Sequence, residues 1–93
     1  MNIEVLKFSA SWCGPCRMLS SILKGVEGIK EIDIDQNREL AQKYNVRSVP
    51  TLVFNVDDKE AYRISGAIPK STYDRIINEL KEGGKKLHCL RLF

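Results

Sequence analysis

Ser11-Trp12-Cys13-Gly14-Pro15-Cys16-Arg17 is the stretch that decides the fold of this chain of 93 residues. Two cysteines separated by two residues can close a disulfide or supply half of a metal site, and the surrounding sequence distinguishes these uses. The apolar run at residues 3–8 predicts a strand before the pair, and apolar residues at helical spacing in 18–23 predict a helix after it. Pro15 suits the first turn of such a helix. The cysteine pair is therefore expected where a strand passes into a helix.

Cys13 is expected near the N-terminus of this helix. The unpaired backbone N–H groups and the dipole at a helix N-terminus favour an anion, and the Cys13 thiolate is the anion available. Cys16 follows three residues later, over the same face of the helix and one turn deeper. This spacing predicts an attacking thiol with a resolving thiol behind it.

The rest of the chain alternates strand and helix patterns. Strands are expected at residues 3–8, 29–35, 51–55 and 61–65, and helices at 15–24, 38–44 and from Lys70 or Ser71 to Gly83-Gly84. The order βαβαββα predicts an α/β fold in which the first two strands are parallel and Asp57-Asp58 turns a hairpin between the last two. We assign residues 1–84 to one domain and residues 85–93 to a C-terminal extension that has no clear place in this fold.

Composition and charge exclude several classes of function. The chain is 43% hydrophobic and 29% charged, which is typical of a globular domain. The net charge of +3 comes without a basic cluster interleaved with aromatic residues, so no nucleic-acid binding is expected. Neither a membrane span nor a signal peptide is expected, because the sequence has no long apolar run and no charged-then-apolar leader. A lone Cys-x-x-Cys pair favours the reducing cytoplasm, although a mature chain whose leader had been removed would look the same.

Four segments resemble the thioredoxin family. Residues 12–16 match its active-site signature, residues 46–52 its segment with a cis-proline, residues 34–37 the entry to its next helix, and residues 65–67 the segment after its hairpin. The resemblance covers roughly residues 3–82 and implies a thioredoxin-like fold with a central four-stranded mixed sheet flanked by helices. The chain begins almost at the central strand, so we expect the smaller core of the superfamily, without the additional N-terminal strand and helix of a full-length thioredoxin.

The resemblance implies a protein-disulfide reductase and electron carrier. The Cys13 thiolate would attack a substrate disulfide, and Cys16 would then attack the Cys13 sulfur and leave a Cys13–Cys16 disulfide. An NADPH-linked flavoprotein, thioredoxin reductase, would reduce that disulfide again. The only redox group expected is therefore this disulfide, with no bound cofactor and no metal. Disulfide-containing proteins are the expected partners, and the chain is expected to be a monomer.

Substrate-binding residues are implied around the cysteine pair. Trp12 is expected to form part of a docking surface beside an exposed thiol. Pro50 is expected to follow a cis peptide bond that turns backbone groups toward the cysteines and keeps metal ions away from them. Plain packing is the alternative role for each of these residues. The remaining residues of the implied shallow groove are Gly14, Pro15, Val49, Gly66 and Ala67.

Lys7 departs from the family pattern. Six residues before the first cysteine, thioredoxins carry a buried aspartate thought to help deprotonate the second cysteine, and a lysine on the neighbouring strand lies close to it. Here Lys7 takes the place of the aspartate and Glu31 that of the lysine. A lone buried charge is costly, so we predict a Lys7–Glu31 contact beneath the cysteines, in which Lys7 favours the Cys16 thiolate and Glu31 takes the proton. The alternative is two unrelated side chains that point to solvent.

Three other functions remain open at this point. The cysteine pair with His88 and Cys89 would supply four zinc ligands, but adjacent residues rarely bind one ion. Glutathione-dependent chemistry of the glutaredoxin type fits the short length, whereas Trp12 and Gly14-Pro15 oppose it. A non-enzymatic binding subunit with this fold is the third. Cys89 itself is expected to be a free thiol, with a regulatory disulfide or a dimer bridge as the alternatives.

Overall fold

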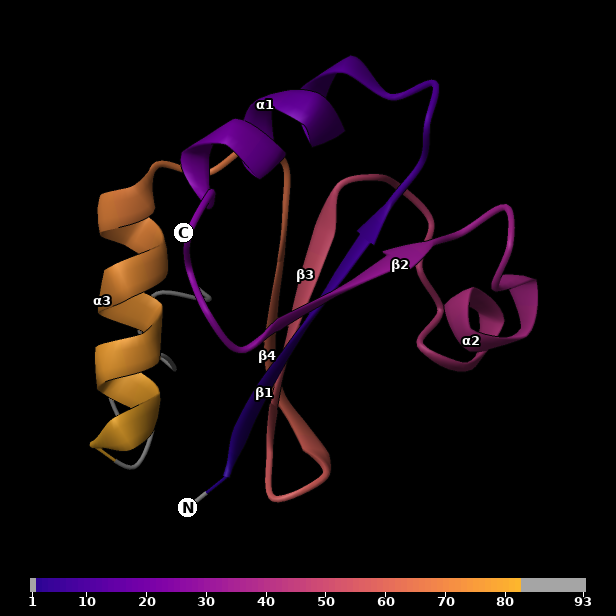
Figure 1. Cartoon of the computed structure of the whole chain (residues 1–93). Helices are drawn as coiled ribbons and strands as arrows, with labels where there is room; N and C mark the ends of the chain where they lie inside the picture. The colour runs from indigo at the N-terminus through magenta and orange to yellow at the C-terminus, as the bar shows by residue number, and fades with distance from the viewer. Residues whose placement is uncertain (1, 83–93) are drawn as a thin grey trace.

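A four-stranded mixed sheet lies at the centre of the chain, with helices on both of its faces (Figure 1). The expected order βαβαββα is confirmed, with the elements β1 (Ile3–Ser9), α1 (Gly14–Ile22), β2 (Ile29–Asp33), α2 (Arg38–Lys43), β3 (Thr51–Val56), β4 (Lys59–Ser65) and α3 (Lys70–Lys81). The strand order is β2-β1-β3-β4. Strand β1 is parallel to β2 and antiparallel to β3, and β3 is antiparallel to β4. The predicted fold class, an α/β fold with a mixed sheet flanked by helices, is therefore confirmed.

This computed structural model describes residues 2–82. Helix α3 ends at Lys81, just before the glycines expected to end it. Gly83-Gly84, the extension 85–93 and its residues His88 and Cys89 lie outside the described residues. The division into a domain and an extension therefore stays a prediction. Within residues 2–82, no helix is both long enough and apolar enough to cross a membrane.

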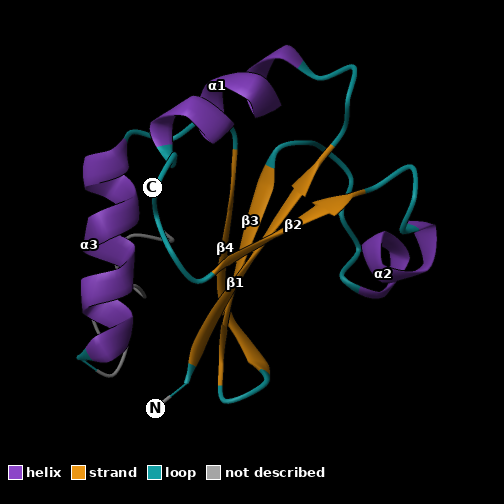
Figure 2. Cartoon of the chain, in the orientation of Figure 1, coloured by secondary structure: helices purple, strands orange, loops and turns teal. Residues whose placement is uncertain are grey.

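The alternation of side chains along β1 separates two apolar cores. Val5 packs in the larger core with residues of α1 and α3. Leu6 and Phe8 point the other way, into a smaller core that α2 covers. Figure 2 shows α1 and α3 on one side of the sheet and α2 on the other. Lys7 shares the face of Val5, so this lysine enters the layer between the sheet and α1.

Aromatic rings fill the larger core. Phe54 of β3 is fully buried, and its ring centroid lies 6.2 Å from that of Tyr62 and 5.8 Å from that of Tyr73. Burial raises the pKa of the Tyr73 phenol above its ordinary value of 10.0, and the nearby Asp74 carboxylate adds to this effect. The rings link β3, β4 and α3, the last three elements of the chain, into one packed layer.

The hairpin between β3 and β4 turns at the two residues that the sequence indicates. Asp57 has a φ of 52° and Asp58 a φ of 69°. A two-residue turn with both φ values positive matches the twist of the flanking strands, and aspartate tolerates this conformation better than most residues. Pairing resumes at once, between Val56 and Lys59, so β4 begins two residues earlier than expected.

Helix α1 and strand β2 each end about two residues earlier than the sequence predicts. Helix α1 ends at Ile22 rather than near residue 24, and Gly25 follows with a left-handed φ of 84°. Strand β2 ends at Asp33 rather than residue 35. The carboxylate Oδ1 of Asp33 accepts a hydrogen bond from the backbone N–H of Asp35 at 2.9 Å, which turns the chain away from the sheet.

Candidate active site

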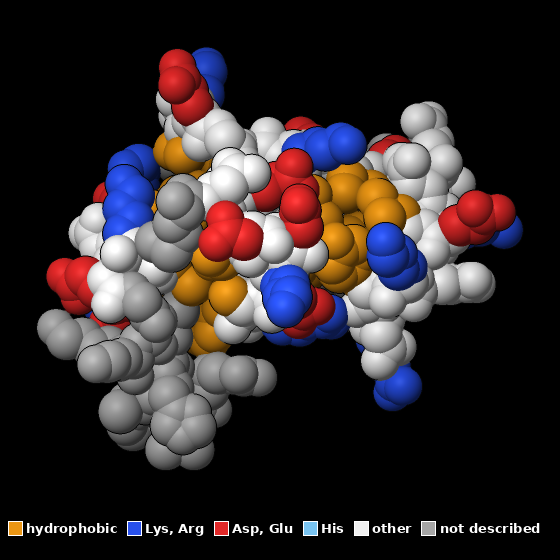
Figure 3. Space-filling view, turned by 90° about the horizontal axis from the view of Figure 1, so that it is seen from below, with side chains coloured by type: hydrophobic (Ala, Val, Ile, Leu, Met, Phe, Trp, Pro, Cys, Tyr) orange, Lys and Arg blue, Asp and Glu red, His pale blue; other side chains and the backbone are white. Residues whose placement is uncertain are grey.

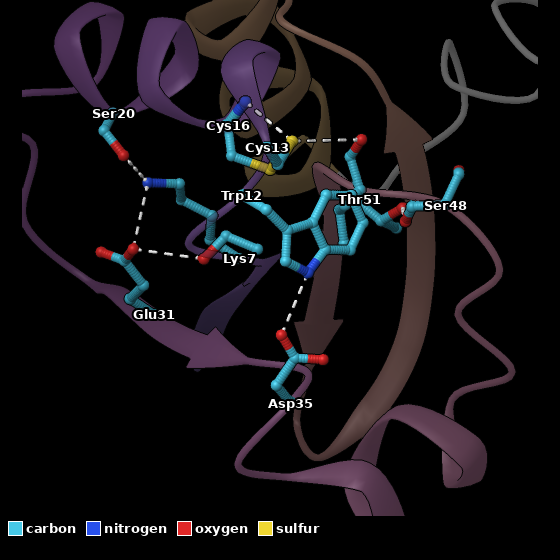
Figure 4. The surroundings of a disulfide bond; sticks show 11 residues. Lys7, Trp12, Cys13, Cys16, Ser20, Glu31, Asp35, Ser48 and Thr51 are labelled. Atoms are coloured by element: carbon cyan, nitrogen blue, oxygen red, sulfur yellow. Dashed lines mark hydrogen bonds and ion pairs between the residues drawn. A yellow bond between two sulfur atoms is a disulfide. The ribbon is translucent and has the colours of Figure 1, made fainter.

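Cys13 and Cys16 form a disulfide at the point where the chain enters α1 (Figure 4). Cys13 is the N-cap residue of this helix, and its Sγ accepts a hydrogen bond from the backbone N–H of Cys16 at 3.1 Å. The same sulfur lies 3.6 Å from the carbonyl oxygen of Val49. The predicted position of the pair, between a strand and a helix with Cys13 at the helix N-terminus, is confirmed. A backbone donor thus already points at the sulfur where thiolate charge is expected.

The disulfide is buried, whereas the neighbouring tryptophan is exposed. Cys13 is 4% exposed and Cys16 3% exposed, and Ala10 packs with them in a small apolar cluster. The expectation that Trp12 lies beside an exposed thiol is therefore wrong for this disulfide form, because Ala10, Ile34 and Val49 pack against the two cysteines. Trp12 itself is 65% exposed.

Asp35 holds the exposed tryptophan in place. The indole Nε1 of Trp12 donates a hydrogen bond to Asp35 Oδ2 at 3.1 Å (Figure 4). Asp35 follows β2, so this bond links the loop before the cysteines to the neighbouring strand. Asp35 belongs to a segment that resembles the family, but its partner could not be predicted from that resemblance.

Pro50 comes just before β3 and follows Val49, whose carbonyl oxygen lies next to Cys13 Sγ. The peptide bond between Val49 and Pro50 is cis, as predicted. Thr51 stabilises the segment that contains this bond, because its Oγ1 donates a hydrogen bond to the Ser48 carbonyl oxygen at 2.7 Å. The carbonyl of Pro50 accepts the Gly66 N–H at 2.9 Å, which brings the segment after β4 to the same end of the sheet.

The other residues of the implied groove occupy the expected elements. Gly14 and Pro15 are exposed in the first turn of α1, and Ala67 is half-buried after β4. Gly66 has a φ of 96°, a conformation that other residues adopt only with strain. Their role in substrate binding stays a prediction.

The predicted contact between Lys7 and Glu31 is confirmed. The two residues are paired in the register of β1 and β2, and Lys7 Nζ lies 3.7 Å from Glu31 Oε1. The alternative in which both side chains point to solvent is wrong for Lys7, which is 3% exposed. Sequence reasoning missed two further members of this cluster. Lys7 Nζ donates a hydrogen bond to Ser20 Oγ, and Ser9 Oγ donates one to Glu31 Oε1 at 3.2 Å (Figure 4).

Both missed serines had a signal in the sequence. Ser20 follows Cys16 by four residues on the same helix, and Ser9 follows Lys7 by two residues on the same strand. These spacings place Ser20 on the face of the helix that carries Cys16, and Ser9 on the face of the strand that carries Lys7. Within residues 2–82 there is no group of three or more histidine, cysteine, aspartate or glutamate side chains that could hold a metal ion. The other two ligands of the zinc alternative lie outside that range.

A disulfide at a helix N-terminus, beside the backbone of a segment with a cis-proline and on a four-stranded mixed sheet, defines a thiol–disulfide oxidoreductase of thioredoxin-like fold. The sequence model of the thioredoxin family matches residues 2–81, and the chain belongs to this family. A thioredoxin of Mycoplasmoides gallisepticum is 40% identical over 84 residues, covering 84% of this chain and 77% of the relative. A thioredoxin of Chlamydia caviae is 37% identical, covering 84% of this chain and 82% of the relative.

Solved structures give the same result. A mutant thioredoxin from Halobacterium salinarum superposes with a TM-score of 0.79 at 32% identity, covering 83% of this chain and 73% of the other. The thioredoxin of Fasciola hepatica superposes with a TM-score of 0.71 at 37% identity, covering 83% of this chain and 80% of the other. The protein is therefore a protein-disulfide reductase of the thioredoxin family, with disulfides as its substrates.

Proposed function

We propose that the chain is an electron carrier that reduces protein disulfides and is itself reduced by a flavoprotein thioredoxin reductase. The observation that carries this proposal is the N-cap position of Cys13, whose sulfur accepts the Cys16 backbone N–H at 3.1 Å. A helix N-terminus stabilises a thiolate there, and a thiolate is the attacking species in disulfide exchange. Cys13 is accordingly the nucleophile and Cys16 the resolving thiol.

The reaction proceeds by two exchanges. The Cys13 thiolate attacks one sulfur of the substrate disulfide, which forms a mixed disulfide and releases the other sulfur as a thiolate. Cys16, deprotonated, then attacks Cys13 Sγ and releases the second substrate sulfur. Two electrons pass to the substrate, which leaves as a dithiol after taking up two protons, and the Cys13–Cys16 disulfide remains. The separation of 5.3 Å between the Cα atoms of the two cysteines is within the range for such a bond.

Trp12 and the segment around Pro50 form the proposed docking surface. The exposed indole is oriented by Asp35, so it presents a rigid apolar face beside the disulfide. The 3.6 Å distance between Cys13 Sγ and the Val49 carbonyl places a backbone acceptor next to the reacting sulfur. An extended substrate segment would lie between these groups, across Gly66.

We assign Lys7 and Glu31 a role in preparing Cys16. The buried Lys7 ammonium lies under α1 and favours negative charge on that helix's thiols, while the largely exposed Glu31 carboxylate exchanges protons with water. In this arrangement Glu31 takes the proton that Cys16 loses. An aspartate at position 7 would instead act as the base itself.

Exchanging the two charges tests this role. Lys7→Asp alone places two carboxylates together, and Glu31→Lys alone places two ammonium groups together, so each is expected to lower turnover by about tenfold. The double variant Lys7→Asp with Glu31→Lys restores opposite charges and is expected to stay within about threefold of the unchanged protein. Turnover is measured by disulfide reduction, and urea denaturation of each variant separates lost activity from lost folding. Equal losses in all three variants would contradict the role.

The proposal also covers bound cofactors, the oligomeric state and the cellular compartment. The protein binds no cofactor, because exchange between thiols and disulfides needs none. It works as a monomer: on the face in Figure 3, charged side chains of both signs divide the apolar side chains that reach the surface. It is cytoplasmic, because a dithiol that reduces other proteins requires a reducing compartment.

A coupled insulin-reduction assay tests the proposed electron source. We expect turnover with NADPH and thioredoxin reductase and none with glutathione and glutathione reductase. Turnover only with glutathione would assign the chain to glutaredoxin-type chemistry and contradict the proposal. Turnover with neither would also contradict it and would indicate a dedicated reductase.

A further inference from the structure

Lys7 is a buried ammonium that makes two polar contacts of different strength with the residues that the structure describes. Its side chain is 4% exposed, and its Nζ donates a hydrogen bond to Ser20 Oγ on α1. Glu31 Oε1 is 3.7 Å from Nζ, near the long limit of an ion pair, and the Glu31 side chain is 63% exposed. Water screens an exposed carboxylate, so its pull on the ammonium is weak. The Ser20 hydroxyl is therefore the contact that fixes the ammonium against α1.

Ser20 also shares a helix face with Cys16. The two residues are four positions apart within α1, so their side chains lie one turn apart on the same side of the helix. Figure 4 shows the Lys7 side chain beneath α1, with its Nζ directed to Ser20 and the two cysteines at the start of the same helix. The Ser20 hydroxyl thus binds the Lys7 ammonium to α1, the helix that begins at the disulfide.

A surface cavity offers the ammonium another position. It has a volume of about 170 Å³ and is lined by Lys7, Ser20, Leu23, Val26, Ile29 and Glu31. Lysine has a flexible four-carbon stem and a strongly hydrated head. Without the hydroxyl, the ammonium would turn into this cavity toward Glu31 and water. Its charge would then lie farther from α1 and would be better screened.

We propose that Ser20 is a positioning residue for the redox reaction: its hydroxyl holds the Lys7 ammonium under α1, where the positive charge stabilises the dithiol form over the disulfide. This inference rests on the proposed action of Lys7 on Cys16. A dithiol reductant supplies two electrons and becomes a disulfide, and the Cys13–Cys16 bond breaks. With one proton taken up, the two sulfurs become one thiol and one thiolate. The disulfide is neutral, so the ammonium lowers the free energy of the reduced form only.

Equilibration with dithiothreitol measures this stabilisation. Ser20→Ala is expected to lower the equilibrium constant for reduction of the disulfide by about threefold to tenfold, tenfold being about 30 mV for two electrons. Ser20→Thr keeps a hydroxyl and is expected to retain most of the constant. Ser21→Ala, at the neighbouring exposed serine of α1, is the matched control and is expected to leave it unchanged. All variants carry Cys89→Ser, so that only the two active-site thiols react.

A Lys7→Met background separates positioning from a purely structural effect. There, Ser20→Ala is expected to change the equilibrium constant by less than about 1.5-fold, because no ammonium remains to be positioned. An equal effect in both backgrounds, or no effect when Lys7 is present, would overturn the proposal. Alanine favours a helix at this exposed position, so circular dichroism is expected to show a folded Ser20→Ala protein. Lys7→Gln replaces Lys7→Met if the latter does not fold.

The dithiothreitol equilibrium needs neither a protein substrate nor a reductase. A shift in Ser20→Ala together with no turnover by thioredoxin reductase would therefore contradict the proposed electron donor and leave the role of Ser20 standing. Turnover with the reductase and an unchanged equilibrium would overturn the role of Ser20 alone.

Discussion

Cys13→Ser is expected to lower disulfide-reductase turnover by on the order of 10⁴-fold, since loss of a covalent nucleophile has effects of this size. A serine hydroxyl stays protonated at neutral pH and cannot form the mixed disulfide. Insulin reduction with saturating reductant measures the loss. Cys89→Ser is the matched control and is expected to keep full turnover, because Cys89 is assigned no part in the exchange.

Cys16→Ser distinguishes the roles of the two cysteines. In this variant Cys13 still attacks the substrate, but no thiol resolves the mixed disulfide. The protein is therefore expected to accumulate covalently bound to its substrate, in a complex that dithiothreitol releases and that non-reducing electrophoresis detects. Accumulation in Cys13→Ser instead would reverse the assigned roles. Reductase activity that survived in the double serine variant would contradict the mechanism and favour a non-enzymatic binding subunit.

Phe54→Ala is expected to lower the free energy of unfolding by about 3–5 kcal/mol. Phe54 is fully buried between Tyr62 and Tyr73, so its removal leaves a cavity that surrounding strands and helix cannot fill. A domain of this size has roughly 5–15 kcal/mol of stability in total, so this loss removes a large part of it. Urea denaturation of the disulfide form measures the change.

Met18→Ala provides the comparison for this loss. Met18 is 60% exposed on α1, and its replacement is expected to change the free energy of unfolding by no more than about 0.5 kcal/mol. A loss below about 1 kcal/mol for Phe54→Ala would mean that the larger core is not packed around this ring. Circular dichroism at zero denaturant confirms that each variant starts from a folded state.

The order of the elements could be predicted because it depends on local patterns. Apolar spacing indicated each strand and helix, and Asp57-Asp58 indicated the hairpin turn that the structure contains. The ends of α1 and β2 were predicted about two residues too far, because a hydrogen bond from the Lys24 N–H to the Ser21 carbonyl and the side chain of Asp33 turn the chain there. Such endings depend on individual backbone angles and hydrogen bonds rather than on periodicity.

The site could be predicted where it depends on local sequence or where the family pattern indicates the partner of a residue. The position of Cys13 at the start of α1 followed from residues 12–16 alone. The Lys7–Glu31 contact was predicted because a buried charge needs a partner and the family pattern indicated which residue supplies it. The bond between Trp12 and Asp35 was not predicted, since neither a local pattern nor a buried charge indicated a partner for the exposed indole.

The sequence by itself determined the order of the elements, the cysteine pair at a helix N-terminus and the class of chemistry, because each depends on residues within one turn or one strand. The tertiary structure alone decided that the disulfide is covered and that Ser20 contacts Lys7. The physical reason is packing. Helix α1 lies across the face of β1 that carries Lys7, so the distance between the side chains of Lys7 and Ser20 depends on how the helix packs on the whole sheet.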